Sequence, residues 1–129
     1  MLDKLFEAAS AAMKKSYSPY SQFPVGAAIL AESGAIYSGC NIENAAYPQG
    51  WCAETSAISH MILGGDHSIR EIAVIAQKKD LATPCGGCRQ KLSEFGSADT
   101  KVHLCNQAGI AETVTLAELL PLAFDLEAS

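Results

Sequence analysis

The chain has 129 residues, the size of one domain, and we expect a single domain over residues 1–129. Hydrophobic residues make up 49% of it and charged residues only 18%, a composition that indicates a folded globular protein and excludes a disordered one. The net charge is −5, and the nine basic residues do not cluster. A nucleic-acid partner is therefore not expected, because phosphate binding depends on grouped lysines and arginines.

The beginning of the chain does not have the pattern of a targeting or membrane segment. The apolar stretch from Ala8 to Met13 is too short to span a bilayer, and acidic residues precede it. Five cysteines, an odd number, fit a reducing compartment better than a disulfide framework. We therefore expect a cytoplasmic protein without a membrane partner.

In the first half of the chain, the hydrophobic pattern changes from helical to strand-like. Apolar residues at helical spacing predict a helix over residues 2–15. Residues 25–31 and 35–38, separated by a Glu-Ser-Gly turn, predict a hairpin. The Asn-, Pro- and Gly-containing segment 39–50 is typical of a loop, and it leads to Cys52.

In the second half, helical and strand patterns alternate. Residues 52–63 have helical period, 71–77 form a buried-strand pattern, a helix is expected from near Cys85, and 101–105 form another strand. Residues 113–120 fit either a strand end or a short helix. In the second case Thr115 would be the N-cap, with Glu118 completing a capping box.

This order of elements predicts the fold class. Strands that alternate with helices after the first hairpin favour parallel pairing, with the first hairpin strand antiparallel at one side. We expect an α/β protein, a three-layer α/β/α domain with a mixed, mostly parallel five-stranded sheet.

Three cysteines and one glutamate form the most informative pattern. Cys52-Ala53-Glu54 is followed by Pro84-Cys85-Gly86-Gly87-Cys88, the layout of zinc deaminases. Three thiolates can hold Zn²⁺ and leave its fourth position open for water, whereas structural zinc sites usually have four protein ligands. The first two cysteines fall at predicted helix N-termini, where the helix dipole favours thiolates. The alternative is a redox-active pair formed by Cys85 and Cys88, in which Cys52 takes no part.

Four further segments extend the pattern from near residue 17 to near residue 124. They are Tyr17-Ser18-Pro19-Tyr20-Ser21, Phe23 to Ala28, Gly39 to Pro48, and Glu118-Leu119-Leu120-Pro121. Together with the zinc pattern, they resemble the small cytidine deaminases. The resemblance implies zinc-dependent hydrolysis of cytidine and deoxycytidine to uridine and deoxyuridine with release of ammonia, a step of pyrimidine salvage. It also implies one zinc ion per subunit and a homotetramer whose pockets are completed by neighbouring subunits.

The resemblance also implies roles for individual residues. Glu54 would be the proton shuttle, although a glutamate in a first helical turn is more often solvated. Asn41 and Glu43 would hold the ribose, since alternate residues of an extended segment point the same way; without that context an Asn-x-Glu pair is typical of a solvated turn. The substrate contacts as a whole would be Phe23, Asn41, Glu43, Ala53 and Tyr47.

One position departs from the family pattern. Many small cytidine deaminases have an arginine directly after the catalytic glutamate, where it offsets the negative charge of the thiolates, and this chain has Thr55. We expect the hydroxyls of Thr55 and Ser56, or Arg89 directly after Cys88, to compensate. The specific hypothesis is that Arg89 donates to a zinc thiolate.

Other functions fit parts of the pattern. A deaminase of blasticidin-type antibiotics would share the zinc residues, but Phe23 and the Asn41-x-Glu43 pair favour an ordinary nucleoside and water as the reactants. An RNA- or DNA-editing deaminase would need a basic path for the strand. A non-catalytic zinc module would not need Glu54.

Overall fold

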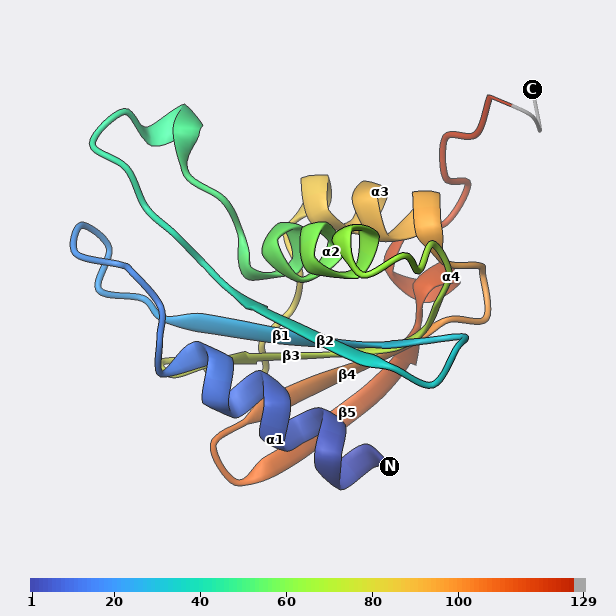
Figure 1. Ribbon diagram of the computed structural model, residues 1–129, viewed down its shortest axis with the longest axis horizontal. Helices are drawn as coiled ribbons and strands as arrows, with labels where there is room; N and C mark the ends of the chain where they lie inside the picture. The colour runs from blue at the N-terminus through green and yellow to red at the C-terminus, as the bar shows by residue number, and fades with distance from the viewer. Residues whose placement is uncertain (127–129) are drawn as a thin grey trace.

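A computed structural model describes residues 1–126 and shows a five-stranded sheet between helices (Figure 1). The elements are α1 (Leu2–Met13), β1 (Val25–Ala31), β2 (Ile36–Cys40), the 3-10 turn η1 (Tyr47–Gln49), α2 (Ala53–Leu63), β3 (Ile69–Ala76), α3 (Gly86–Phe95), β4 (Lys101–Asn106), β5 (Gly109–Thr115) and α4 (Leu116–Leu119).

The sheet is mixed, but it is not mostly parallel. Its strand order is β2-β1-β3-β4-β5, and only the β3–β4 pair is parallel. The prediction of a mostly parallel sheet was therefore wrong. Strands β2, β3 and β4 do run in one direction, as the alternation of strands and helices implied, but β1 lies between β2 and β3 and is antiparallel to both.

The composition of β1 explains its central place. Its sequence, VGAAILA, is an almost unbroken run of small and aliphatic residues, and six of its seven residues are buried. The β2 sequence, IYSGC, is mixed, and all five of its residues are half-buried. A strand covered on both faces needs the continuous apolar run, whereas an edge strand tolerates polar residues. The apolar strand is therefore central and the mixed strand is at the edge.

Helices cover both faces of the sheet, so the predicted three-layer α/β/α arrangement is confirmed (Figure 1). Helix α1 packs on β1, β2 and β3 through its buried side chains Leu5, Ala9 and Met13. On the opposite face, α2 packs on β1 and β2, and α3 lies beside α2. Apolar residues from both sides of the strands fill the two interfaces, which form separate cores.

Close approach of α2 to the sheet depends on a glycine. A Cβ atom at Gly39 in β2 would overlap the backbone of Ser56 and Ala57 in α2. The missing side chain lets α2 lie directly on the edge strand. This contact is one turn from the N-terminus of α2, so it fixes the position of Cys52 and Glu54.

Most expected elements are present, with shifted ends. Helix α1 ends at Met13 rather than at residue 15, and β2 continues to Cys40 rather than ending at residue 38. The ambiguous segment 113–120 contains both alternatives. Thr115 ends β5 and is also the N-cap of α4, where it forms the predicted capping box with Glu118.

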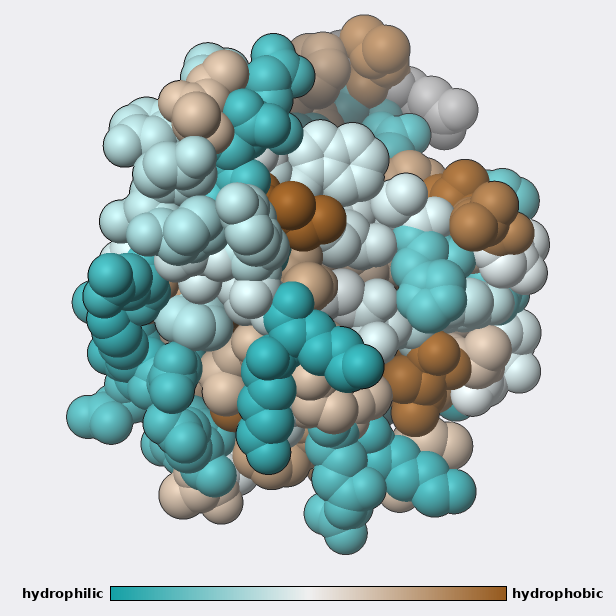
Figure 2. All heavy atoms as spheres, turned by 60° about the vertical axis from the view of Figure 1, so that its left-hand side comes forward, coloured by the Kyte–Doolittle hydropathy of each residue, from teal (hydrophilic) through white to brown (hydrophobic). Residues whose placement is uncertain are grey.

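The surface carries no continuous apolar area on the face drawn in Figure 2, where apolar atoms occur in small separate patches among hydrophilic ones. Within residues 1–126, the longest helix has 12 residues, and none has the length and apolar content to cross a bilayer.

Candidate metal centre and active site

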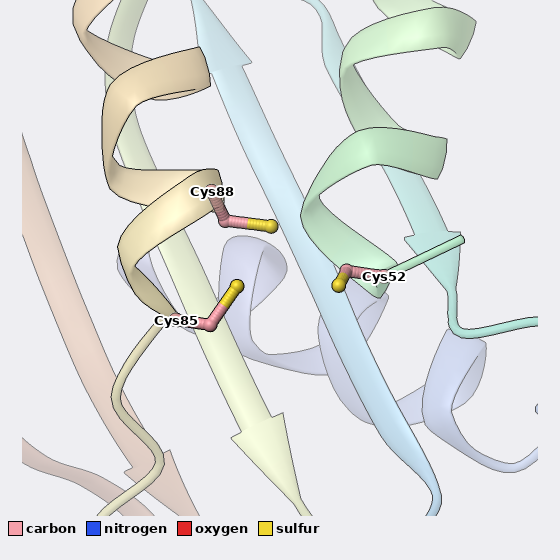
Figure 3. Close-up of side chains that lie close together, drawn as sticks. All are labelled: Cys52, Cys85 and Cys88. Carbon is pink, nitrogen blue, oxygen red and sulfur yellow. The ribbon is translucent and has the colours of Figure 1, made fainter. Parts of the chain in front are cut away.

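The three predicted zinc-ligand cysteines lie together where α2 and α3 begin. Cys52 is the N-cap of α2, Cys85 is the N-cap of α3, and Cys88 lies in the first turn of α3. Their sulfur atoms point toward one another across the gap between the two helices (Figure 3) and lie within 4.8 Å of one another. The fold thus brings Cys52 next to two cysteines that lie 33 and 36 positions further along the chain.

This arrangement fits a zinc ion. Sulfur ligands at about 2.3 Å from a tetrahedral Zn²⁺ lie about 3.8 Å apart, so small rotations of the cysteine side chains suffice to close the site. Within residues 1–126, this is the one group of three or more His, Cys, Asp or Glu side chains that could hold a metal. Three sulfur donors leave one tetrahedral position for a further ligand.

Two of the three thiols, Cys52 and Cys88, have pKa values shifted in opposite directions. A hydrogen bond from the Cys88 thiol lowers the pKa of Cys52 to about 6, and the positive charge of Lys91 acts in the same direction. The same hydrogen bond, together with burial, raises the pKa of Cys88. A bound cation would favour the deprotonated form of every thiol around it.

Glu54 is a buried carboxyl group beside these sulfurs. It lies in the first turn of α2 and is only 4% exposed. Burial raises its pKa to about 7, and the negative charge of Cys52 adds to the increase. A carboxyl group with a pKa near neutrality can both accept and donate a proton at physiological pH. Glu54 is therefore not a solvated surface glutamate, which was the alternative considered above.

A cavity of about 320 Å³ adjoins the cysteines and Glu54. Its walls come from β1, β3, the beginning of α2 and the segment that precedes α3. Most of the surface is apolar, with a few polar groups, as is usual for small-molecule sites. The lining residues are Phe23, Val25, Asn41, Cys52, Ala53, Glu54, Val74, Ala76, Lys79, Leu81, Ala82, Thr83 and Cys85.

Asn41 combines a structural role with a place in the cavity wall. Its Oδ1 accepts hydrogen bonds from the Ser16 hydroxyl and, at 2.9 Å, from the Val25 backbone N–H. Its Nδ2 donates to the Phe23 carbonyl oxygen at 2.9 Å. The amide therefore holds Phe23 next to the cavity and keeps a second N–H for another acceptor.

Glu43 and Tyr47 line a second cavity, of about 350 Å³, together with Tyr20, Ser21, Asn44 and Gly50. The Glu43 carboxylate accepts hydrogen bonds from the backbone N–H groups of Tyr20 and Ser21, at 2.9 and 3.1 Å, and from the Ser21 hydroxyl. The Ser21 hydroxyl is the main cause that lowers the pKa of Glu43, which is therefore an anion. Tyr47 is 75% exposed and meets the Tyr20 ring edge-on.

The Arg89 side chain donates to backbone carbonyls in the structure. Its Nε donates to the Pro84 carbonyl at 2.8 Å and a terminal nitrogen donates to the Leu119 carbonyl at 3.0 Å. The hypothesis that Arg89 donates to a thiolate is thus not supported by this geometry. Thr55 does reach the site, since its Oγ1 lies 3.9 Å from the Cys88 Sγ. The buried Ser56 Oγ has no hydrogen-bond partner within the described chain.

A family model, the zinc-binding region of cytidine and deoxycytidylate deaminases, matches residues 1–104. The chain belongs to this deaminase family. The matched region includes the three clustered cysteines and Glu54. Zinc is therefore the metal cofactor of this deaminase, and the redox alternative for the CxxC pair is set aside.

Individual relatives agree over nearly the whole chain. A cytidine deaminase of Sporosarcina psychrophila is 45% identical over 126 residues, which are 98% of this deaminase and 93% of the relative. The crystal structure of a cytidine deaminase from Burkholderia pseudomallei matches with a TM-score of 0.90 and 39% identity, over 96% of this chain and 99% of that one. The crystal structure of a cytidine deaminase from Mycobacterium tuberculosis matches with a TM-score of 0.86 and 33% identity, over 96% of this chain and 97% of that one. The α/β fold of this deaminase is that of these enzymes.

Two residues at the sites have no place in the sequence-based prediction. Lys91 donates to the Thr55 hydroxyl at 2.8 Å, and Ser21 holds the Glu43 carboxylate. For Lys91 a signal was available, since it follows Cys88 by three residues and therefore lies on the same side of the helix. Ser21 belongs to one of the family-like segments, but its pairing with Glu43 was not predictable, because the contact joins two loops 22 residues apart.

Proposed function

We propose that this deaminase hydrolyses cytidine and deoxycytidine to uridine and deoxyuridine and releases ammonia, with zinc held by Cys52, Cys85 and Cys88. The observation that carries the proposal is the position of Glu54. Its buried carboxyl group, with a pKa near 7, lies beside three clustered thiols in the wall of a mostly apolar cavity. The relatives that match almost the full chain are cytidine deaminases, which supports cytidine as the substrate.

When bound, zinc acts as a Lewis acid and acidifies water in its open position. Glu54 moves the protons that hydrolysis requires. Its carboxylate accepts a proton from the attacking water and delivers it to N3 of the pyrimidine, which makes C4 more electrophilic. After the water oxygen has bonded to C4, the carboxylate takes the remaining proton of the new C4 hydroxyl and passes it to the amino group; the C4–N bond breaks, ammonia leaves and C4 becomes a carbonyl. Proton transfer by a positioned side chain is worth roughly 10²–10⁴ in rate.

The apolar walls suit the flat pyrimidine ring. Phe23, held by Asn41, offers an aromatic face against which the base would stack. Ala53 is buried at the first helical position of α2, where the backbone N–H has no acceptor within the helix. This N–H and the second Nδ2 hydrogen of Asn41 are two donors in the cavity wall that could bind substrate oxygens.

Glu43 favours nucleosides over nucleotides. Glu43 lines the second cavity and not the one that Asn41 lines. As an anion there, it would accept a hydrogen bond from a sugar hydroxyl that reaches it and repel a phosphate. This point separates the two substrates in the family description, cytidine and deoxycytidylate. Activity on deoxycytidine well above that on deoxycytidine monophosphate would support this role for Glu43, and the reverse preference would contradict it.

The remaining proposals concern the whole molecule. We propose one catalytic domain over residues 1–129, a homotetramer, a cytoplasmic location and a role in pyrimidine salvage. The exposed rings of Tyr47 and Tyr20, which meet edge-on beside the second cavity, support completion of the substrate site by a neighbouring subunit, because aromatic residues are enriched at protein–protein interfaces. Mass measurement of the native assembly tests the tetramer.

The deciding experiment compares the unmodified protein with Glu54→Gln. Cytidine and deoxycytidine turnover is followed by ultraviolet absorbance, and zinc is measured in both proteins. We expect zinc in both and turnover only in the unmodified protein. Glu112→Gln, which removes an exposed carboxylate from β5, is the matched control and should be fully active. If the unmodified protein holds zinc but converts neither nucleoside, the substrate assignment is wrong.

A further inference from the structure

A zinc ion held by the three cysteines leaves the proposed site with excess negative charge. Three thiolates exceed the charge of Zn²⁺ by one unit, and the Glu54 carboxyl group lies beside them in a buried position. Excess negative charge in a partly buried site is costly unless a nearby cation or hydrogen-bond donor offsets it. Arg89, the cation next in sequence to Cys88, donates to two backbone carbonyls instead.

Lys91 brings a positive charge close to the cysteines. Lys91 lies one turn after Cys88 on α3, and its Nζ donates to the Thr55 Oγ1 of α2 at 2.8 Å. The Thr55 Oγ1 in turn lies 3.9 Å from the Cys88 Sγ. The contact joins the two helices that carry the cysteines. Among the described residues Lys91 forms no contact ion pair with a carboxylate, and its positive charge acts on Cys52 and Glu54.

The chemistry of the three groups fixes the direction of these bonds. A lysine ammonium can only donate, so the Thr55 oxygen is the acceptor and its hydroxyl proton stays available. A metal-bound Cys88 is a thiolate and can only accept. The chain of donors therefore runs from Lys91 through the Thr55 hydroxyl to the Cys88 sulfur, and the ammonium polarises the hydroxyl toward the thiolate.

We propose that Lys91 stabilises the three-thiolate zinc site through the Thr55 hydroxyl, supplying from α3 the positive charge that the residue after Glu54 does not provide. The inference rests on the zinc site of the proposed function. Lys91 touches neither the substrate cavity nor the reacting atoms, so it is a positioning residue. Outer hydrogen-bond partners of metal ligands typically change metal affinity by roughly 10- to 100-fold when they are removed.

The test is the rate at which zinc passes from the purified holoprotein to a coloured chelator, which requires no substrate. Lys91→Met keeps the aliphatic length of the side chain and removes its charge, and Thr55→Val keeps the shape and removes the hydroxyl. Each should speed zinc release roughly 10-fold or more. Lys91→Arg and Thr55→Ser should stay near the unmodified rate. Lys101→Met, at an exposed position in β4, is the control for the same change in net charge.

The double variant Lys91→Met/Thr55→Val separates one connected chain from two independent effects. If the residues act in series, it should release zinc no faster than the more affected single variant, whereas independent contributions would multiply. The melting temperature of metal-free Lys91→Met should equal that of the metal-free unmodified protein. A lowered value would assign Lys91 a general structural role and overturn the proposal.

An unchanged release rate for Lys91→Met, or multiplied effects in the double variant, would also overturn it. Failure of the proposed function gives a different result. A protein that holds zinc in a Lys91-dependent manner but does not convert cytidine would support the present inference and contradict the substrate assignment. A protein that holds no zinc would contradict both.

Discussion

Cys52 and Cys85 have nearly the same backbone conformation at equivalent positions of neighbouring helices. Each is an N-cap residue, with φ −72° and ψ 158° for Cys52 and φ −68° and ψ 167° for Cys85. Neither side chain accepts a capping hydrogen bond from its helix. Both sulfurs are therefore free to face a metal while the positive ends of two helix dipoles favour their thiolate forms.

Cys85→Ser should separate stability from metal binding. Serine is a preferred N-cap residue and would accept the capping bond that the thiol does not, so the metal-free protein should gain about 0.5–1 kcal/mol in free energy of unfolding. Zinc should be lost in dialysis against a chelator, and with it deamination. Denaturant unfolding and zinc content measure the two effects. Cys40→Ser, outside the cluster, should keep its zinc; equal loss in both variants would contradict the assignment of Cys85.

The pKa of Glu54 predicts how the stability of the metal-free protein depends on pH. The folded-state pKa is raised from 4.5 to about 7, so between these values the folded protein holds more protons than the unfolded chain. The free energy of unfolding should therefore fall as the pH rises, by about 1 kcal/mol per pH unit from this group. Denaturant titrations at about pH 5 and pH 6 measure the slope.

Glu54→Gln is the control for that slope, because glutamine does not titrate. Cys52 contributes in the opposite sense, since its lowered pKa adds stability as the pH rises above about 6. Cys52 is present in both proteins, so the difference between their pH profiles reports on the carboxyl group. Parallel pH profiles for the unmodified protein and the variant would mean that the Glu54 carboxyl group is not raised in pKa.

Asn41→Asp should weaken both folding and substrate binding. The Nδ2 donor to the Phe23 carbonyl is replaced by an oxygen, which leaves two acceptors facing each other. A broken, partly buried hydrogen bond of this kind costs about 1–3 kcal/mol. We expect this loss in urea unfolding and a raised KM for cytidine. For the unfolding measurement, Asn44→Asp is the matched control, because the Asn44 oxygen accepts from the Ala46 N–H and aspartate preserves that bond.

Gly39→Ala should disturb the zinc site from a distance. The added methyl group would collide with the backbone of α2 at Ser56 and Ala57, and overpacking of this kind costs about 1–3 kcal/mol. Displacement of α2 would move Cys52 relative to Cys85, so we expect faster zinc release along with lower stability.

Gly87→Ala provides the contrast to Gly39→Ala. A Cβ at Gly87 meets nothing within 4 Å, and the position is helical. Alanine there should raise stability by about 0.5 kcal/mol. Equal behaviour of the two variants in unfolding and zinc release would show that the contact between β2 and α2 does not position the site.

The sequence was sufficient for features that depend on local pattern. The three cysteines, their helix N-termini and Glu54 were predictable because the chemistry of a zinc site restricts both residue type and spacing. The strand neighbours were not, because the hydrophobic pattern of β1 is compatible with pairing to β2 alone or to β2 and β3 together. Tertiary packing decided between these, and the sheet became mostly antiparallel.

The contacts of long side chains also could not be predicted from the sequence. Arg89 and Lys91 are two residues apart, both are cationic, and both follow the third cysteine closely. Adjacency to Cys88 favoured Arg89, yet its guanidinium turns to carbonyl groups while Lys91 crosses to Thr55. Helical spacing puts Lys91 on the same side of α3 as Cys88, but the acceptors that the two side chains reach depend on where α4 and α2 lie, which the local sequence does not show.

The hydrogen bond from Arg89 to Leu119 has a consequence for biosynthesis. All metal-ligand cysteines have been made once residue 88 is translated, but the carbonyl that receives the adjacent guanidinium is added some thirty residues later. A nascent chain that already displays three thiols still lacks this acceptor and the last two strands of the sheet. Because domains fold as units during synthesis, we expect the protein to acquire its metal late, after nearly the whole chain has left the ribosome.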